Sequence, residues 1–420
     1  MEQLLPTKEE WQALYKAMRQ IEKLEPWKSI GETNIFGIQN PDTGELGFVS
    51  VMGMWEEYTA VALYLGAAGL YEFLNFEATG AELHHLVAAE GLVSIRHLQA
   101  SFEERKFLAK EDHAVIKNLG LKFRNTWPFF RSYEAGLSPW FLNAGEVRFL
   151  TYALEQVPDI VFRFQRDVFL LECDEVEHYL VRVAHKDDAA LAWHDEVLFV
   201  PPPEEKLLPP AEVDQTLVNA IKKLPKGRLE VEIDFFMLTQ LIADRERPHF
   251  PYILMIADSQ TGRIIGQKVV AVETTHEVMY TQVPMNILRQ FASLGAMPRR
   301  IDTRPQWLYQ MLKPLLKELK VELNQDDYLP ALEDVQDGLM EFTQLDKTEM
   351  SSLFEGDHMQ KVINTIPGLA ELFEQLQVLE SAVVDLEPDS SRLEELMKEL
   401  NQIQVAIMQL TSDYMSDQAD

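Results

Sequence analysis

Apolar and polar residues alternate in two different rhythms along the chain, and these rhythms predict where helices and strands form. From Trp11 onward, apolar residues recur every three or four positions, which is the period of one helix face. Thr7 and Glu10 precede this stripe with the spacing of a capping box, so the first helix is expected to begin here. Apolar runs on both sides of Asn40–Gly44 predict a β-hairpin over residues 34–53.

The next segments continue this mixture of helix and strand. Residues 56–74 carry apolar side chains in helical phase and predict a second helix. Asn143 and Glu146 stand in capping-box spacing before a third helix, which Pro158 is expected to end. The succession indicates an α+β module. Two further strands are expected to complete it, over residues 179–185 and 190–200.

Prolines mark the end of this α+β module, which is expected to cover residues 1–199. Five prolines lie between Pro201 and Pro210 and suppress both helix and central strand, so residues 200–227 are expected to form an extended connector. The order of elements expected in residues 228–337 is three strands, helix, strand, helix, strand, which indicates an α/β module with one mixed sheet. The expected strands cover residues 229–238, 252–258, 263–272, 300–303 and 320–324, and the expected helices residues 279–293 and 306–319.

The last part of the chain, residues 338–420, predicts helices only. Leucines and isoleucines from Leu393 to Leu410 step by three and four residues, which is the spacing of a packed helix. Another helix is expected before the break at Glu387–Asp389, so the product is a helical hairpin. Its apolar stripe must be buried, either on the body of the same chain or on a partner. Burial on the body of the same chain is the favoured interpretation, and a protein partner or a homodimer through the 369–410 helices is the alternative.

Charge narrows the classes of function. The chain has 38 basic and 68 acidic side chains, a net charge of -30, so nucleic-acid binding over the whole surface is not expected. The charge is uneven, because residues 228–331 carry 12 basic and 13 acidic side chains, whereas residues 338–420 carry 4 and 17. The charge distribution does not exclude a local nucleic-acid contact on the second module, or an acidic tail that covers such a contact.

Cysteine content and hydropathy indicate the compartment. Cys173 is the single cysteine, which excludes a disulfide framework and is typical of a reducing compartment. No stretch of 18 uncharged apolar residues is present and the N-terminus has no signal-like run, so a cytoplasmic protein without membrane contact is expected. The histidines lack metal-ligand spacing. No cofactor is expected on these grounds.

One pattern in the second module resembles the core of the RNase H-like and transposase-integrase folds. A strand ending in Asp234 is followed by a hairpin, a helix and a strand that carries Asp302. The resemblance implies a divalent metal site, Mg or Mn, at Asp234 and Asp302 with a third acid from a later helix. Glu333, Asp334 and Asp337 are the candidates for that third acid. Two metals bridged by carboxylates clamp the attacking and leaving oxygens of a phosphodiester.

The same residues admit a structural interpretation. Strand alternation places Glu230, Glu232 and Asp234 on one face, so this face is expected to be wet. The residues after Asp302 are Thr303-Arg304-Pro305, which departs from the glycine that often follows this acid in the family. A non-catalytic domain of the fold is the favoured interpretation, since a fold does not determine an activity.

Aromatic residues are concentrated between Arg124 and Phe141. Trp127, Arg131 and Trp140 are candidates for a site that stacks bases or holds a peptide. The favoured alternative is an irregular loop whose aromatic residues are anchored in the core of the first module.

The triplet Asp42-Thr43-Gly44 is that of an aspartic-protease site, yet it stands between two short strands. A hairpin turn requires such residues, so a turn is predicted here.

Across most of the chain, the sequence resembles a bacterial family of unknown function that joins an N-terminal α+β module to a C-terminal α/β module. The likeness covers about residues 8–335 and leaves out the acidic tail. The segments that carry it are residues 11–15, 24–27, 34–37, 49–53, 121–124 and 247–252.

The sequence therefore favours a non-catalytic cytosolic interaction or regulatory protein. The alternative is a metal-dependent nuclease-type phosphodiesterase of RNase H-like fold, in which Asp234, Asp302 and one helical acid bind Mg or Mn.

Overall fold

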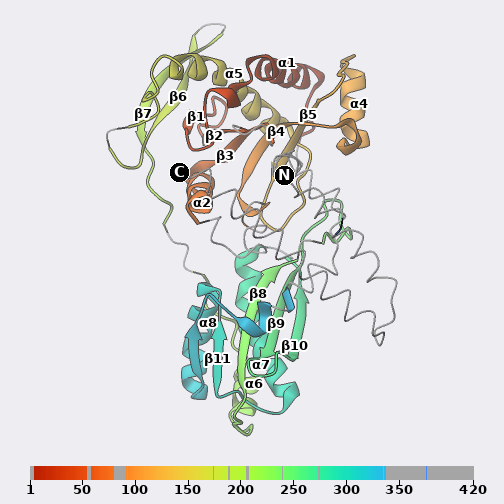
Figure 1. The fold of residues 1–420 in the computed structure, drawn as a ribbon, viewed down its shortest axis with the longest axis vertical. Helices are drawn as coiled ribbons and strands as arrows, with labels where there is room; N and C mark the ends of the chain where they lie inside the picture. The colour runs from red at the N-terminus through yellow and green to blue at the C-terminus, as the bar shows by residue number, and fades with distance from the viewer. Residues whose placement is uncertain are drawn as a thin grey trace. The chain divides into compact units, whose positions relative to one another are not determined.

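The computed structural model describes residues 4–336, apart from residues 54–57, 80–90, 92, 174, 188–189, 205–207, 239, 273–274 and 334, and beyond residue 336 it describes residue 375 alone. The described residues form two mixed β-sheets with helices packed on them, so the predicted combination of helices and strands in both modules is confirmed (Figure 1). The predicted tail, including the 369–410 helices, lies outside the described residues except for residue 375.

The first sheet has seven strands in the order β5-β4-β3-β2-β1-β6-β7. All neighbours are antiparallel except β1 and β6, which run parallel. The predicted hairpin over residues 34–53 and the two later strands are confirmed by β1, β2, β6 and β7. The strands are β1 Phe36–Gln39, β2 Leu46–Met52, β3 Ala60–Leu65, β4 His97–Glu103, β5 Trp127–Tyr133, β6 His178–Asp187 and β7 Ala190–Phe199.

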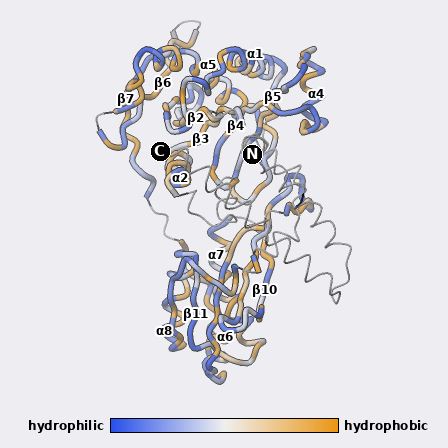
Figure 2. The backbone as a smooth tube through the Cα atoms, viewed as in Figure 1, coloured by the Kyte–Doolittle hydropathy of each residue, from blue (hydrophilic) through white to orange (hydrophobic). Residues whose placement is uncertain are grey.

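Helices cover both faces of this sheet. α1 (Lys8–Leu24) and α5 (Ala144–Phe164) share one hydrophobic cluster with β1 to β5, whereas α2 (Gly66–Thr79) packs with Phe48 and Tyr64 on the other face. The amphipathic character of α1 is visible in Figure 2 as alternating hydrophilic and hydrophobic residues. Its predicted capping box at Thr7 and Glu10 is confirmed. The remaining helical elements of this module are η1 Pro26–Lys28, η3 Arg105–Phe107 and α4 Lys110–Asn118.

The predicted helix over residues 56–74 is wrong in its first half, because residues Ala60–Leu65 form β3. Every residue of β3 is buried, since the strand lies inside the sheet and is covered on both faces. A continuous apolar run of this length cannot be assigned to strand or helix by periodicity alone. Gly66 then adopts a φ of +69°, which lets the chain turn directly from β3 into α2.

Two other local predictions are corrected. α5 begins at the predicted Asn143 cap but continues past Pro158 to Phe164, because Ile160, Val161 and Phe164 bury their side chains in the core. The aromatic segment over residues 124–141 was predicted as an irregular loop, but its residues Trp127–Tyr133 form β5, the edge strand of the sheet. The turn at Asp42-Thr43-Gly44 is confirmed, since Gly44 has a φ of +76° and its N–H donates to the Asn40 carbonyl.

The second sheet has five strands in the order β10-β9-β8-β11-β12. β8, β9 and β10 are antiparallel neighbours, while β11 lies parallel to β8 on one side and to β12 on the other. The predicted order of three strands, helix, strand, helix, strand is confirmed. The elements are β8 Glu230–Met237, β9 Tyr252–Asp258, β10 Ile264–Val270, α7 His276–Leu294, β11 Arg300–Thr303, α8 Gln306–Leu319 and β12 Glu322–Gln325.

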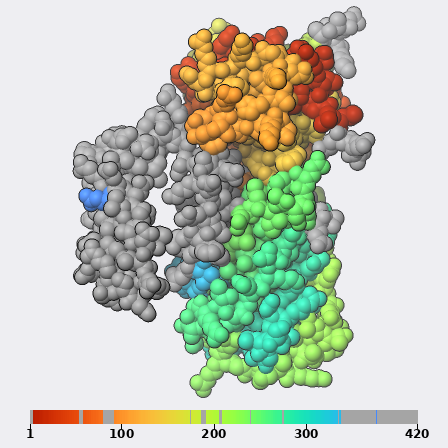
Figure 3. Space-filling model, turned by 90° about the vertical axis from the view of Figure 1, so that its right-hand side faces the viewer, coloured from red at the N-terminus to blue at the C-terminus, as the bar shows by residue number. Residues whose placement is uncertain are grey.

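Three helices cover one face of the second sheet. α6 (Gln215–Ile221), α7 and α8 share a hydrophobic cluster with Val231, Ile233 and Phe235 of β8. The yellow-green to cyan part of Figure 3 shows the outer surface of this module. α6 begins inside the segment predicted as an extended connector, residues 200–227. Its position differs from that prediction because Val218 and Ile221 are buried in the second core.

Within the part of the chain that the structure describes, no helix combines the length and the hydrophobicity needed to cross a bilayer.

Candidate functional site

The acids predicted from the RNase H-like pattern lie on the face of the second sheet opposite α6, α7 and α8. Glu232 and Asp234 of β8 are only 3% and 2% exposed, so the expectation of a wet face is wrong. Residues 329–336 cover this face, and Leu329 and Leu332 pack there in a small hydrophobic cluster with residues of β8 and β9. We call Glu232, Asp234, Asp302 and Glu333 the acid cluster.

Asp234 is surrounded by donors from the protein. Its Oδ1 accepts a hydrogen bond from the Phe235 N–H at 2.9 Å, and its Oδ2 accepts one from Gln336 Nε2 at 2.8 Å. Arg304 Nη1 lies 3.6 Å from Asp234 Oδ2, and Arg304 Nη2 pairs with Glu333. Burial raises the pKa of Asp234, while the charge of Arg304 and the bond from Gln336 act in the opposite direction. Arg304 therefore lies between the two carboxylates that were predicted to hold a metal.

Glu232 has a different role in the same cluster. Its Oε2 accepts hydrogen bonds from the backbone N–H groups of Ala331 and Leu332, at 2.8 and 3.1 Å, in the first turn of the helical segment that begins at Pro330. Such N–H groups have no partner within a helix, so a carboxylate there stabilises the helix start. Burial raises the pKa of Glu232, and the charge of Asp302 raises it further.

The strand register determines which acids are neighbours. Asp302 pairs in register with Glu232 rather than with Asp234, and it accepts hydrogen bonds from Arg300 Nε at 3.0 Å and Asn324 Nδ2 at 2.9 Å. No group of three potential metal-ligand atoms within 4.8 Å of one another includes these acids in the described part of the chain. The other two candidates for the third acid, Asp334 and Asp337, lie outside the described residues.

The second predicted site, in the aromatic segment, has an internal arginine. Arg131 is 6% exposed and forms two bonds with Asp112, at 3.0 and 2.7 Å. Its guanidinium also lies over the rings of Phe129 and Phe141, at 3.8 and 4.7 Å from the centroids. Both Nη atoms of Arg131 have acceptors within the module and two rings lie against its guanidinium, which favours a structural role for Arg131.

The two tryptophans of that prediction are partly buried, and their rings contact different neighbours. Trp127 packs against the core of the first module and has ring contacts with Phe123 and His113. Trp140 has a ring contact with Phe141 and pairs through its backbone with Ser132. The interpretation that these aromatics anchor the module agrees with their packing.

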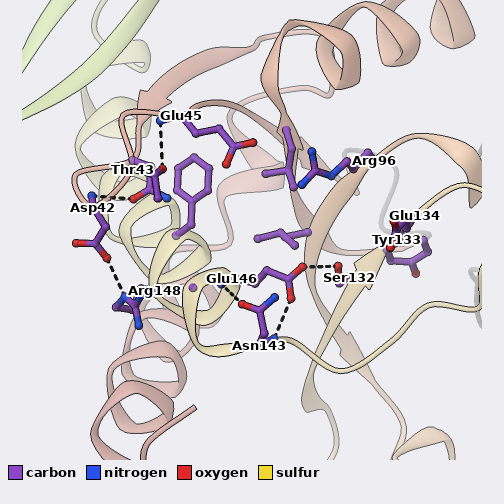
Figure 4. A pocket seen from close by; sticks show the side chains of 15 residues that line it. Asp42, Thr43, Glu45, Arg96, Ser132, Tyr133, Glu134, Asn143, Glu146 and Arg148 are labelled. Carbon is purple, nitrogen blue, oxygen red and sulfur yellow. Dashed lines mark hydrogen bonds and ion pairs between the residues drawn. The ribbon is translucent and has the colours of Figure 1, made fainter. Parts of the chain in front are cut away.

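A cavity of about 330 Å³ lies in the first module and was not predicted from the sequence. Its walls are the β1–β2 turn, strand β5 and the N-terminus of α5, with Arg96 from the residue before β4 (Figure 4). The residues come from segments about 100 positions apart, so no local motif marks this site. Its lining is mainly polar and contains side chains of both charges.

Several charged groups of this cavity already have ion-pair or hydrogen-bond partners. Arg148 donates from Nε to Asp42 at 2.8 Å and from Nη1 to Glu10 at 2.6 Å. Glu146 accepts hydrogen bonds at 2.8 Å from the Ser132 hydroxyl and the Asn143 N–H. These groups hold the cavity walls together.

Two opposite charges of the lining have no partner among the described residues. Glu134 pairs with Arg247 at 3.0 Å, whereas the side chains of Glu45 and Arg96 form no hydrogen bond or ion pair with other described residues. Both point into the cavity in Figure 4. The cavity thus presents one uncompensated anion and one uncompensated cation.

Two histidines of the β6–β7 hairpin lie close together in the fold. His185 and His194 lack ligand spacing in the sequence, yet β6 and β7 pair so that their rings stack with centroids 4.2 Å apart. Together with Glu196 they form the group of potential metal ligands found among the described residues. Histidines two register positions apart on paired strands are the signal that spacing rules along the sequence do not capture.

Comparisons with known proteins identify the two modules. Residues 11–182 match a domain of unknown function (DUF7309), and residues 217–340 match a second domain of unknown function (DUF6930). The prediction of a protein built from domains of unknown function is confirmed. No curated protein matches the chain.

A solved structure is similar to part of the chain. The catalytic core domain of BIV integrase is 14% identical, with a TM-score of 0.20. The alignment covers 27% of this chain and 66% of that chain, which is just under two thirds of its length.

Proposed function

We propose that this protein, which joins two domains of unknown function, is a non-catalytic interaction or regulatory protein whose second module has an RNase H-like architecture without metal chemistry. The position of Arg304 between Asp234 and Glu333 carries this proposal. A two-metal centre needs carboxylates that are free to bridge the ions. Here a side-chain cation and donors from residues 331–336 satisfy those carboxylates instead.

The arginines near the acid cluster support the same proposal. Arg299 and Arg300 both pair with Glu230, and Arg300 also pairs with Asp302. A surface that binds phosphates uses arginines as donors to phosphate oxygens. Because these guanidinium groups already have carboxylate partners, they offer little attraction to a nucleic-acid backbone.

Metal-dependent cleavage is the direct test. The full-length protein, incubated with Mn²⁺ and single- or double-stranded nucleic acid, is expected to cleave no faster than its Asp234→Asn variant. Mn²⁺-dependent cleavage that Asp234→Asn and Asp302→Asn both abolish would support the alternative phosphodiesterase and overturn this proposal. Circular dichroism of each variant establishes that it is folded.

The cavity of the first module is the place where the proposal locates a small ligand. Its volume of about 330 Å³ is at the lower end of the range for small-molecule sites. Arg96 suits an anionic group, and Glu45 suits a cationic one. A small zwitterion carries both groups. The predicted 369–410 helices, outside the described residues, are the proposed contact for a protein partner or a second copy.

Free α-amino acids are suitable probes for this cavity. A ligand present at 100 times its Kd raises the free energy of unfolding by about 2.7 kcal/mol, which a thermal shift detects. At least one amino acid of a standard panel is expected to stabilise the protein. The shift is expected to disappear in Glu45→Gln and Arg96→Gln and to persist in Arg166→Gln, which removes an exposed charge outside the cavity. No shift with any amino acid, or an equal shift in all variants, would remove the zwitterion site from the proposal.

A further inference from the structure

We propose that His185, His194 and Glu196 form a binding site for a late first-row divalent cation, Zn²⁺ in particular, on the β6–β7 hairpin. One potential ligand atom from each residue lies within 4.8 Å of the other two. His194 Nε2 lies 2.8 Å from Glu196 Oε1. This site is separate from the acid cluster and does not depend on the function proposed for either module.

Strand register produces this arrangement. In the antiparallel pair, His185 lies opposite Ala192, and His194 lies opposite Val183. Residues opposite each other in such a pair point to the same side, as do residues two apart on one strand. His185, His194 and Glu196 therefore share one face of the hairpin, with the two histidines as diagonal neighbours whose planes differ by 10°.

The opposite face of the hairpin holds these residues in place. Asp195, between the two ligands of β7, bonds to Arg182 Nη1 at 2.6 Å and also pairs with Arg163 of α5. Trp193 packs against the core of the first module and has a ring contact with Tyr152 of α5. The residues before and after His194 in β7, Trp193 and Asp195, thus both contact helix α5. A site whose ligands are already positioned needs less ordering when the metal binds.

The ligand types select the metal. Two imidazoles and one carboxylate are a common zinc set, with bonds of about 2.0–2.2 Å, whereas Mg²⁺ and Ca²⁺ prefer oxygen ligands only. The imidazole of His194 is half-exposed, and its Nδ1 is buried without a hydrogen-bond partner in the described structure. Because three protein ligands leave a fourth position open, the site can also accept water or a ligand from a partner.

Proton competition follows from the same geometry. The hydrogen bond between His194 and Glu196 must give way to the metal, and each imidazole must offer a lone pair, so metal binding releases protons.

The test is a Zn²⁺ titration of the metal-free, full-length protein by isothermal titration calorimetry in excess Mg²⁺, which occupies weak carboxylate sites. One saturable site is expected. His185→Ala and Glu196→Gln are each expected to lower its affinity at least about tenfold, since the loss of even an outer-shell partner has an effect of that size. His178→Ala is the matched control, because His178 lies on the same strand and also neighbours a carboxylate, Glu175.

Three results would overturn the proposal: no saturable Zn²⁺ site, an affinity unchanged in both ligand variants, or an equal loss in His178→Ala. Glu196→Gln keeps the size and hydrogen-bonding capacity of the side chain, so its result is interpretable even where His185→Ala disturbs the hairpin. Far-ultraviolet circular dichroism of each variant confirms folding. Cleavage assays with Mn²⁺ report on the acid cluster alone. The outcome for the proposed function therefore does not decide the outcome for the Zn²⁺ site.

Discussion

Replacement of Arg304 by alanine is expected to lower the free energy of unfolding of the second module by about 3–5 kcal/mol, because it leaves buried carboxylates without their cation. The side chain of Arg304 is 12% exposed, and its partners Asp234 and Glu333 are 3% and 19% exposed. Water cannot replace the lost interaction at such sites, so the desolvation of the acids is no longer offset.

The expected loss depends on pH in a defined direction. Without Arg304, the remaining way to neutralise Asp234 is to take up a proton. Burial already raises the pKa of this carboxyl, and removal of a neighbouring cation raises it further. The destabilisation by Arg304→Ala should therefore be larger at alkaline pH, where uptake of a proton is unfavourable, than at acidic pH.

Hydrogen–deuterium exchange of the β8 and β11 amides measures this loss within the second module. The matched control is Arg299→Ala, which removes an arginine from an ion pair with Glu230 near the same strand. Arg299 is 62% exposed, so its removal is expected to change stability by about 0–1 kcal/mol. Equal protection factors in the two variants would contradict the assignment of Arg304 as the cation of the acid cluster.

The same variant tests whether Arg304 takes the place of a metal. In Arg304→Ala, Asp234 and Glu333 lose their protein cation, and carboxylates are ligands for Mn²⁺. Mn²⁺ is expected to restore part of the lost amide protection in Arg304→Ala and to leave the wild-type protein unchanged. Protection of wild-type β8 by Mn²⁺ would instead indicate a metal site that coexists with Arg304.

Strands were predictable where apolar and polar residues alternate strongly along the chain. In β8, acidic residues alternate with Val231, Ile233 and Phe235, and the predicted strand agrees with the structure within one residue at each end. The alternation could not reveal what covers the acidic face. That cover comes from residues 329–336, about 100 positions later, and the difference between a wet and a buried acid rests on this distant contact.

Elements whose identity depends on tertiary contacts were predicted less well. Residues 60–65 form an unbroken apolar run, and their place within a seven-stranded sheet, rather than their period, makes them a strand. Pro158 lies inside α5 because burial of the following turn outweighs the local cost of proline. His185 and His194 meet only once the register of β6 and β7 is known. The cavity beside α5 combines four segments and has no local signature.

Acidification is expected to destabilise the first module through His97. This side chain is 6% exposed, and its Nδ1 lies 2.7 Å from the Ile95 carbonyl oxygen. Burial lowers the pKa of His97 from 6.5 to about 4, although its hydrogen bonds act in the opposite direction. Between these two values the unfolded chain binds a proton that the folded chain does not, so stability falls as the pH falls. The full loss is about 3 kcal/mol, and about 2 kcal/mol of it is expected by about pH 5.

The variant His97→Phe isolates this effect, because a phenyl ring does not titrate and can retain the stacking on Tyr133, whose ring centroid lies 4.2 Å away. Urea unfolding followed by tryptophan fluorescence reports mainly on the first module, which holds six of the seven tryptophans. Loss of the bond to Ile95 lowers stability at every pH, whereas loss of proton binding changes only the pH dependence. Relative to His97→Phe, the wild-type protein should lose about 2 kcal/mol of unfolding free energy between neutral pH and about pH 5.

The variant His113→Phe, at a half-buried histidine of α4, is the matched histidine-to-phenylalanine change in the same module. Parallel curves for wild type and His97→Phe would mean that His97 binds its proton equally well in the folded and unfolded chain, and the acid sensitivity of the module would then have another origin.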